Sequence, residues 1–416
     1  MNRAGKLPFQ RMDSTGWQNL ALAGLLIFYL IQICFDLFWH TTCGHLAIDY
    51  CAFWSTGKVA NTNGFGAVYN LQLIGKVQKT TFPNLTATTP TPFLPVFIIP
   101  FQSLALLDVY SSFWIWTILN LILIISYLYY LSTQWSDRSF SMRFILMMLI
   151  SLPIFINIFT GQVNAWLMIC LGEFMRAILA GKKIKAGLWL GGLLLKPQTL
   201  VLIVPFLLIQ RTYKVLAGWV TSSIVLMGVS LALVGSNGLQ KLVGLWLGYV
   251  GGLPTNDVEI MMNWRMLGLH LSSITFPIFG WIVVGLGSIS TLLATAYLCY
   301  RQIDFHTKSF VMVLFGLLAA TDLFAWHSHI HMAMILIPPI IYLKGQNQLP
   351  DDILNTWVFL PAGVYTIVFI LASLTSVNIL PASLNGALNF LRGASEFGLN
   401  IYILSWVINS FRKHNV

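Results

Sequence analysis

Twelve apolar runs follow one another along this chain, and most of them approach the roughly 20 residues that an α-helix needs to cross a bilayer. Charged residues make up only 9% of the 416 residues, whereas soluble proteins carry roughly 25%. The chain is therefore predicted to be an all-α integral membrane protein, with residues 1–416 forming a single polytopic domain. The runs cover residues 17–38, 92–107, 109–131, 143–159, 163–180, 186–209, 215–235, 277–300, 309–325, 330–343, 354–373 and 396–411.

Several of these runs are short or broken, notably two in which proline, which ends or kinks a helix, interrupts the apolar residues. The run 92–107 contains several prolines, and 186–209 is interrupted by Lys196-Pro197. Non-helical backbone at membrane depth needs protein or a cavity to satisfy its polar groups. We therefore expect ten full crossings with these two runs as partial ones, and twelve ordinary crossings are the alternative.

The basic residues predict the orientation, because cytoplasmic loops carry an excess of Lys and Arg. Basic residues precede the first run and follow the last one, so both termini are predicted to be cytoplasmic: Arg3, Lys6, Arg11, Arg412 and Lys413. The net charge of +10 is spread between the apolar runs, which argues against nucleic-acid binding. Four stretches are then predicted to lie outside: 39–90, 236–276, 326–329 and 374–395.

The first outside stretch, 39–90, is long for a loop between membrane helices and is rich in aromatic residues. Loops of this length are usually functional or disordered, and this one is too aromatic for disorder. We expect it to contain short interfacial helices. Cys43 and Cys51 lie in it and could form a disulfide in an oxidising compartment, although nothing in the sequence requires one.

The chain has only thirteen acidic residues, so each can be sorted by its position. Glu173, within an apolar run, has a candidate structural partner in Arg176. Asp49 is the only acid in 39–90, and an ionisable group near the membrane boundary is a candidate for function. The alternative is an ordinary surface carboxylate on an interfacial helix. The other acids assigned to the outer side are Asp36, Asp257, Glu259, Asp322 and Glu396.

Three histidines, His327, His329 and His331, lie within five residues where a helix is predicted to begin at the outer face. A spacing of two does not place side chains on one face of a helix, so a three-histidine zinc site would require an extended backbone. No metal site is predicted. The functional interpretation is that one or two imidazoles face a cavity as phosphate donors or acid-base groups. The alternative is an interfacial belt of Trp and His.

Other isolated polar residues indicate an anionic substrate. Lys196 stands alone at membrane depth beside a helix-breaking proline, so it should be paired or face a polar cavity. Gln162 and Asn164 lie in a turn between two apolar runs, which is a weak signal by itself. Arg265, in the second outside stretch, is a donor suited to phosphate. Together with Asp49 and the histidines, these residues suit chemistry on a lipid-linked anionic substrate.

Four blocks of sequence carry most of these residues. They are Ile48-Asp49-Tyr50-Cys51-Ala52-Phe53-Trp54 with Gly64 and Val68-Tyr69-Asn70; Thr89-Pro90-Thr91-Pro92-Phe93 with Pro100; Gly161-Gln162-Val163-Asn164 with Lys196-Pro197 and Arg211; and Trp326-His327-Ser328-His329. In this order, over residues 45–340, they resemble the polyprenol-phosphate-sugar-dependent glycosyltransferases of the GT-C superfold, in particular glycosyltransferase family 87. The family often has adjacent histidines where Ser328 separates two here.

The resemblance implies a GT-C fold of about 10–12 transmembrane helices in the cell membrane, with an outward-facing cavity and no cofactor. The donor would be a polyprenyl phosphate sugar, with mannose favoured, and the acceptor a lipid or glycan. Asp49 is the expected general base, with inversion at the anomeric carbon. Lys196, Arg265 and His329 are expected to stabilise the leaving phosphate. Further residues are expected to bind substrate: Gln162, Asn164, His327, Tyr50 and Trp54.

Three other functions are compatible with the sequence. A multi-span transporter could use broken helices and a membrane-embedded lysine, although no internal repeat supports it. A GT-C relative with a diphosphate donor would need more cationic residues on the outer side. A non-catalytic assembly subunit would tolerate substitution of Asp49 and Lys196.

Overall fold

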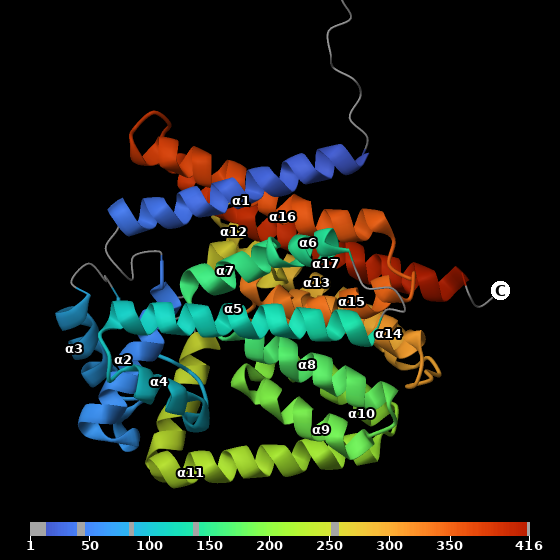
Figure 1. Ribbon diagram of the computed structural model, residues 1–416, viewed down its shortest axis with the longest axis horizontal. Helices are drawn as coiled ribbons and strands as arrows, with labels where there is room; N and C mark the ends of the chain where they lie inside the picture. The colour runs from blue at the N-terminus through green and yellow to red at the C-terminus, as the bar shows by residue number, and fades with distance from the viewer. Residues whose placement is uncertain (1–13, 40–45, 83–86, 136–140, 251–257, 414–416) are drawn as a thin grey trace, which may run out of the picture.

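The computed structural model describes residues 14–39, 46–82, 87–135, 141–250 and 258–413 (Figure 1). The chain is 83% helical, with 17 α-helices and no strand among the described residues. This confirms the predicted all-α fold class. Some residues singled out in the sequence lie outside the described part: Arg3, Lys6, Arg11, Cys43 and Asp257.

Five described helices are long and apolar enough to cross a membrane: α1 (Ser14–Trp39), α5 (Val109–Gln134), α11 (Tyr213–Val250), α13 (Pro277–Cys299) and α16 (Asp351–Ser376). No more than 33% of the residues in the apolar stretch of each helix are buried. Apolar surface on this scale is not left in contact with water, so these helices indicate a multi-pass membrane protein. α6 (Met142–Leu149) and α7 (Leu152–Thr160) form a sixth candidate span, bent by 51°.

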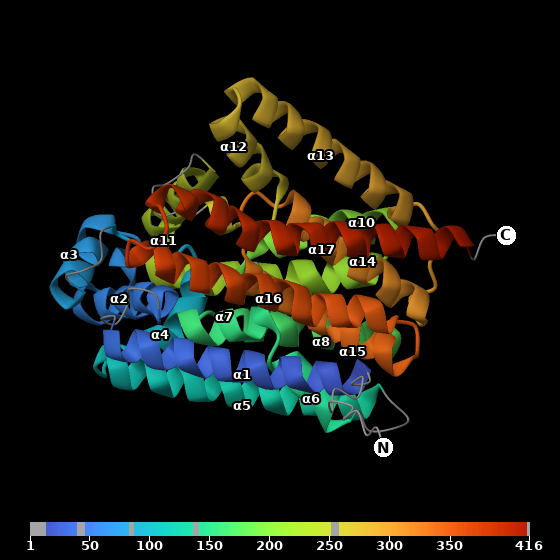
Figure 2. The ribbon, with the colours of Figure 1, turned by 90° about the horizontal axis from the view of Figure 1, so that it is seen from above.

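The remaining predicted runs form helices that are too short or too polar to count as full spans by themselves. They are α8 (Asn164–Leu179), α14 (Lys308–Phe324), α15 (Ile337–Gly345) and α17 (Asn385–Lys413). The total of ten to twelve crossings therefore stays a prediction. α1, α5, α16 and α17 run along the long axis of the molecule in both views (Figures 1 and 2), whereas the hairpin of α12 (Trp264–Ile274) and α13 stands off the rest (Figure 2).

The runs 92–107 and 186–209 are both broken, as predicted. Residues 92–107 form a 3-10 helix, Pro95–Ile98, followed by the short α4 (Ile99–Leu104). Residues 186–209 form α9 (Lys183–Gly191), two 3-10 helices and α10 (Ile203–Ile209), with the break at Lys196. Proline has no amide hydrogen and its ring clashes with the preceding turn, so Pro197 can begin a helix but cannot continue one.

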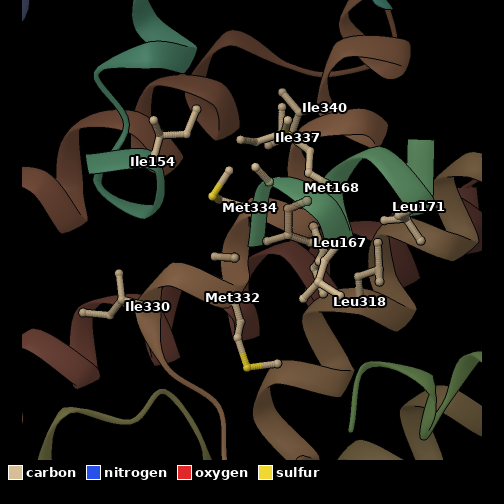
Figure 3. Packing of buried hydrophobic residues seen from close by; sticks show 14 of the residues in the cluster. Ile154, Leu167, Met168, Leu171, Leu318, Ile330, Met332, Met334, Ile337 and Ile340 are labelled. Carbon is tan, nitrogen blue, oxygen red and sulfur yellow. The ribbon is translucent and has the colours of Figure 1, made fainter. Parts of the chain in front are cut away.

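The core lies where α14 and the segment after it meet α8. α14 is buried continuously from Val313 to Leu323, as expected for a helix that is apolar all round. After it comes the 3-10 helix Ile330–Leu336, whose Met332 and Met334 pack with Leu167, Met168 and Leu318 in one cluster (Figure 3). This packing fixes the position of the segment that precedes it, residues 325–329.

The first stretch predicted to be outside, 39–90, is largely helical where the structure describes it. It contains α2 (Ile48–Asn63), the 3-10 helix Phe65–Ala67 and α3 (Leu71–Thr81). α2 is buried over most of its length and packs against α4. α2 and α3 (blue) lie together at one end of the long helices (Figures 1 and 2).

The second stretch predicted to be outside, 236–276, is also largely helical in its described part. α11 continues through it to Val250, after a break at Gly235, where φ is 67° and ψ is 178°. This left-handed region suits glycine because glycine has no Cβ. The remainder of the stretch contains α12.

One fold prediction concerns the contact between α9 and α11. A Cβ on Gly187 would overlap the backbone carbonyl of Val215, whereas a Cβ on Gly228 of α11 has nothing within 4 Å. Overpacking costs about 1–3 kcal/mol, so Gly187→Ala should lower the melting temperature of the detergent-purified protein. Gly228→Ala should leave it unchanged or raise it, because alanine favours helix. Equal melting temperatures for the two variants would contradict the close packing of α9 on α11.

Candidate active site

A cavity of about 1320 Å³ lies where the four stretches predicted to be outside come together. Each contributes to its wall, through Asp49, Trp246, His327 and Asn385 among others. The wall also includes the last turns of α1 and α16 and the first turns of α2 and α17. The cavity therefore opens at one end of the long helices. The predicted site residues in its lining are Asp49, Gln162, Lys196, His327 and His329.

Lys196 is the buried cation of this cavity, with 7% of its surface exposed. Its Nζ donates a hydrogen bond to Oε1 of Gln162 at 3.0 Å and lies 3.2 Å from Nε2 of His331. It also interacts electrostatically with the Asp49 carboxylate. The break before Pro197 lets the side chain of Lys196 leave the helical path and enter the cavity wall. The expectation that Lys196 is paired or faces a polar cavity is met on both counts.

The Gly161–Asn164 turn positions Gln162. Gly161 ends α7 in the left-handed conformation at φ 76°, where glycine has no steric penalty. The backbone amide of Gln162 donates to the Asn157 carbonyl at 2.8 Å, and that of Asn164 donates to Oδ1 of Asn157 at 2.9 Å. Asn157 thus fixes both ends of the turn, and the Gln162 side chain reaches Lys196. The Asn164 side chain is fully buried and does not line the cavity.

The backbone around His329 is extended. His329 has φ −116° and ψ 158° and forms an isolated antiparallel bridge with Met261, while the Met262 amide donates to the Ser328 carbonyl at 3.0 Å. In extended backbone, alternate side chains point to the same side. His327 and His329 therefore both line the cavity, with their ring centroids 4.6 Å apart.

His331 joins this row one step further on. It lies in the 3-10 helix Ile330–Leu336, lines the cavity, and has its ring centroid 5.7 Å from that of His329. All three histidines of residues 327–331 thus line the cavity, more than the one or two expected. Among the described residues, no group of three or more His, Cys, Asp or Glu side chains has the arrangement of a metal site.

Ser328 points the other way and anchors this segment from behind. Its Oγ donates to Oδ1 of Asp322 at 3.1 Å, and both residues are fully buried. Asp322 is one of the acids assigned to the outer side by sequence. The alternation explains the His-Ser-His pattern: the histidines face the cavity and the serine holds their backbone in place.

Burial controls the charge of these histidines. It lowers the pKa of His327 to about 4, and the charges of Lys196 and Arg265 act in the same direction. Burial also lowers the pKa of His329 well below its usual value. At neutral pH both rings are therefore uncharged, so each offers one N–H donor and one acceptor.

Asp49 lies in the first turn of α2 and is half-buried. The Ala47 amide, just before the helix, donates to the Phe159 carbonyl at 2.9 Å and joins the start of α2 to the end of α7. Residues three and four positions apart share a helix face, and Ala52 and Phe53 line the cavity with Asp49.

The same periodicity explains why two neighbours of Asp49 point elsewhere. Tyr50 is fully buried, is hydrogen-bonded to Ser112 and packs against the ring of Phe113. The Trp54 indole donates to the Leu107 carbonyl at 3.2 Å. The structure thus places both predicted substrate-binding residues in packing contacts between α2 and its neighbours, outside the cavity lining.

Arg265 does not line the cavity but contacts Trp326, a residue that does. Its guanidinium lies 4.7 Å from the centre of the Trp326 ring. Asn263 caps α12 by accepting from the Met266 amide at 3.0 Å, and its Nδ2 donates to the Ala325 carbonyl at 2.8 Å. Asn263 thereby joins α12 to the chain just before the histidines.

A family model named glycosyltransferase family 87 matches residues 92–321, more than half of the chain. The chain belongs to glycosyltransferase family 87. It is thus a membrane glycosyltransferase, which uses a sugar donor and an acceptor, and this favours an enzyme over a transporter or an assembly subunit. Searches of curated proteins and of solved structures found no match.

The matched part of this glycosyltransferase contains Gln162, Lys196 and Arg265. Asp49 lies before the matched range in the sequence, and the three histidines of residues 327–331 lie after it. The structure brings Asp49 and these histidines into the same cavity as Lys196 and Gln162. The cavity thus combines residues from inside and outside the matched range.

Sequence reasoning missed one wall of the cavity. α1, α16 and α17 contribute Gln32, Tyr365 and Arg392, and none of these was singled out. A signal for Arg392 was present, because it is a basic residue in the stretch 374–395 that was assigned to the outside, against the usual excess of basic residues in the cytoplasm. Asp36, one of the rival acids, also lies in this wall.

The hydrogen bond by which Asn263 joins α12 to the chain before His327 can be tested by substituting two helix-capping asparagines. Asn263→Ala and Asn70→Ala each remove a helix cap, since Asn70 accepts from the amides of Gln72 and Leu73. Each should cost roughly 0.5–2 kcal/mol of stability. Only Asn263→Ala also removes the hydrogen bond to the Ala325 carbonyl, just before the histidines. For a similar loss of stability, this variant should therefore transfer sugar more slowly than Asn70→Ala. Equal rates in the two folded variants would contradict this role.

Proposed function

We propose that this glycosyltransferase moves a sugar, with mannose favoured by family resemblance, from a polyprenyl phosphate to a hydroxyl of a lipid or glycan acceptor. The observation that carries the proposal is the buried Lys196 ammonium group, held beside the Asp49 carboxylate in the wall of a large cavity. A buried cation in such a cavity suits an anionic ligand that can replace its water.

The donor's chemistry fits the surroundings of Lys196. Apolar side chains such as Ile156, Phe159 and Leu195 line the same cavity, so a prenyl chain would find apolar walls close to the cation. A monophosphate carries little charge, which one ammonium group and neutral N–H donors can balance. Lys196 and His329 supply both kinds of donor, and Gln162 can contact the phosphate or the sugar. Arg265 would act through Trp326.

In the proposed reaction, Asp49 removes the proton of the acceptor hydroxyl as its oxygen attacks the anomeric carbon. The bond from that carbon to the phosphate oxygen breaks, and polyprenyl phosphate leaves with the electron pair. Attack opposite the leaving group inverts the anomeric configuration. Lys196 and His329 stabilise the negative charge that grows on the phosphate oxygen.

The proposed location of the site is the outer face of the cell membrane, with both termini in the cytoplasm. Two observations support it. The four stretches assigned to the outside from the basic residues all contribute to one cavity, which is expected if they lie on one side. Cys51, two residues after the cavity-lining Asp49, is disulfide-bonded, and disulfides persist in oxidising compartments.

Asp49→Asn should lower the transfer rate by about 10²–10⁴-fold, the usual contribution of a general base. The measurement is release of polyprenyl phosphate from a polyprenyl phosphate mannose donor by the detergent-purified protein. Asp108→Asn is the matched control, because Asp108 caps α5 at the surface and asparagine caps equally well. A folded Asp49→Asn variant with the wild-type rate would exclude Asp49 as the base.

Lys196→Gln should chiefly weaken binding of the donor phosphate, because glutamine keeps a hydrogen-bond donor but removes the charge. Lys185→Gln, on the exposed part of α9, is the control for loss of one lysine. We expect at least about a tenfold rise in the dissociation constant for citronellyl phosphate, a soluble isoprenoid monophosphate, in line with a lost charge-assisted hydrogen bond. Unchanged affinity would remove Lys196 from the donor site.

A further inference from the structure

The cavity has a second cation on a different wall. Arg392 of α17 lines it, and its guanidinium lies 4.8 Å from the centre of the Tyr365 ring on α16. Gln32 of α1 donates from Nε2 to the hydroxyl of Tyr365 at 2.6 Å. Lys196 is held instead by Gln162 and His331. The two cations therefore belong to separate sets of contacts within one cavity.

Arg392 is positioned without a direct ion pair, and the one described carboxylate in this wall, Asp36 of α1, acts on the same Tyr365. The Nε of Arg392 is buried and has no hydrogen-bond partner, and no ion pair with a carboxylate is found for this residue among the described residues. Its only described contact with an aromatic ring is the stacking on Tyr365. A partly buried guanidinium whose Nε has no hydrogen-bond partner gains from an anion in direct contact, and it matches phosphate or carboxylate through two parallel hydrogen bonds.

The surroundings of Arg392 indicate what kind of molecule carries that anion. Apolar side chains of Phe35, Phe369 and Leu388 line the cavity near the ends of the same three helices. Hydroxyl and amide groups follow along α16 and α17, where Oγ1 of Thr375 donates to Oδ1 of Asn385 at 2.7 Å. This wall thus offers a charge, an apolar surface and polar groups suited to sugar hydroxyls.

We propose that Arg392, supported by Tyr365 and Gln32, binds the anionic group of an amphiphilic acceptor, a phosphodiester or carboxylate next to its lipid portion. This inference rests on the proposed function, in which Lys196 takes the donor phosphate. With one anion at each cation, donor and acceptor occupy different parts of the one cavity that Asp49 also lines. The acceptor hydroxyl then has access to Asp49. Acceptors without an anionic group would leave Arg392 without a direct ion partner and would bind more weakly.

The test measures binding of three soluble probes to the full chain in neutral detergent by titration calorimetry. Dihexanoyl phosphatidylglycerol is an anionic amphiphile, dihexanoyl phosphatidylcholine has the same chains without net charge, and citronellyl phosphate represents the donor. Wild-type protein should prefer phosphatidylglycerol to phosphatidylcholine. Arg392→Gln should weaken phosphatidylglycerol binding at least about tenfold and leave citronellyl phosphate binding within about twofold.

Matched variants separate charge from structure. Arg301→Gln is the control, because Arg301 also lies over a tyrosine ring, 4.5 Å from the centre of Tyr297, but outside the cavity lining; it should change neither affinity. Arg392→Lys keeps the charge and should lose less affinity than Arg392→Gln. Tyr365→Leu removes the ring beneath the guanidinium and should weaken phosphatidylglycerol binding without removing a charge. If Arg392→Gln does not fold, Arg392→Lys and Tyr365→Leu still test the proposal.

Two results would overturn the inference. One is phosphatidylglycerol affinity that is the same in wild type and Arg392→Gln. The other is loss of citronellyl phosphate binding in Arg392→Gln to the extent seen in Lys196→Gln, which would assign Arg392 to the donor. If Lys196→Gln instead leaves citronellyl phosphate binding intact while Arg392→Gln abolishes the preference for phosphatidylglycerol, the donor proposal fails and the Arg392 site stands.

Discussion

A buried ammonium group needs partners that replace its water, and the arrangement around Lys196 follows from that requirement. Pro197 breaks the apolar run so that the side chain can reach the cavity wall. Gln162 accepts a hydrogen bond from the ammonium group, and Nε2 of His331 also lies within hydrogen-bonding distance of it. The Asp49 carboxylate adds an opposite charge. Elements from four distant parts of the chain thus meet at one cation.

The histidine segment depends on a different constraint, the pleat of extended backbone. If residues 327–331 had continued α14 as a helix, His329 would have pointed to the opposite face from His327 and His331, because each residue turns about 100° around the axis. The bridge between His329 and Met261 keeps the backbone extended there, and the bond from Ser328 to Asp322 holds it from behind. The stretch 236–276 is thus part of the site through its backbone, in addition to any side chain it contributes.

Sequence reasoning succeeded where the signal was local. Lys196 stood out because a charge in an apolar run is conspicuous on its own, and Asp49 because no other acid lies in its loop. Tyr50 and Trp54 were chosen by proximity in sequence, but each residue turns about 100° around a helix, and the cavity face of α2 passes through Ala52 and Phe53 instead. The contact between Gln32 and Tyr365 could not be found in this way, since the two residues are 333 positions apart.

The division of the cavity between segments bears on how such a protein can change its specificity. Lys196 and Gln162 lie within residues 92–321, the part matched by the family model, whereas α1, α16 and α17 lie beyond it. Those three helices form a layer joined by side-chain contacts such as that between Gln32 and Tyr365. Under the proposed roles, replacing these three helices would change which acceptor receives the sugar. The contacts between the donor and Lys196 would stay the same.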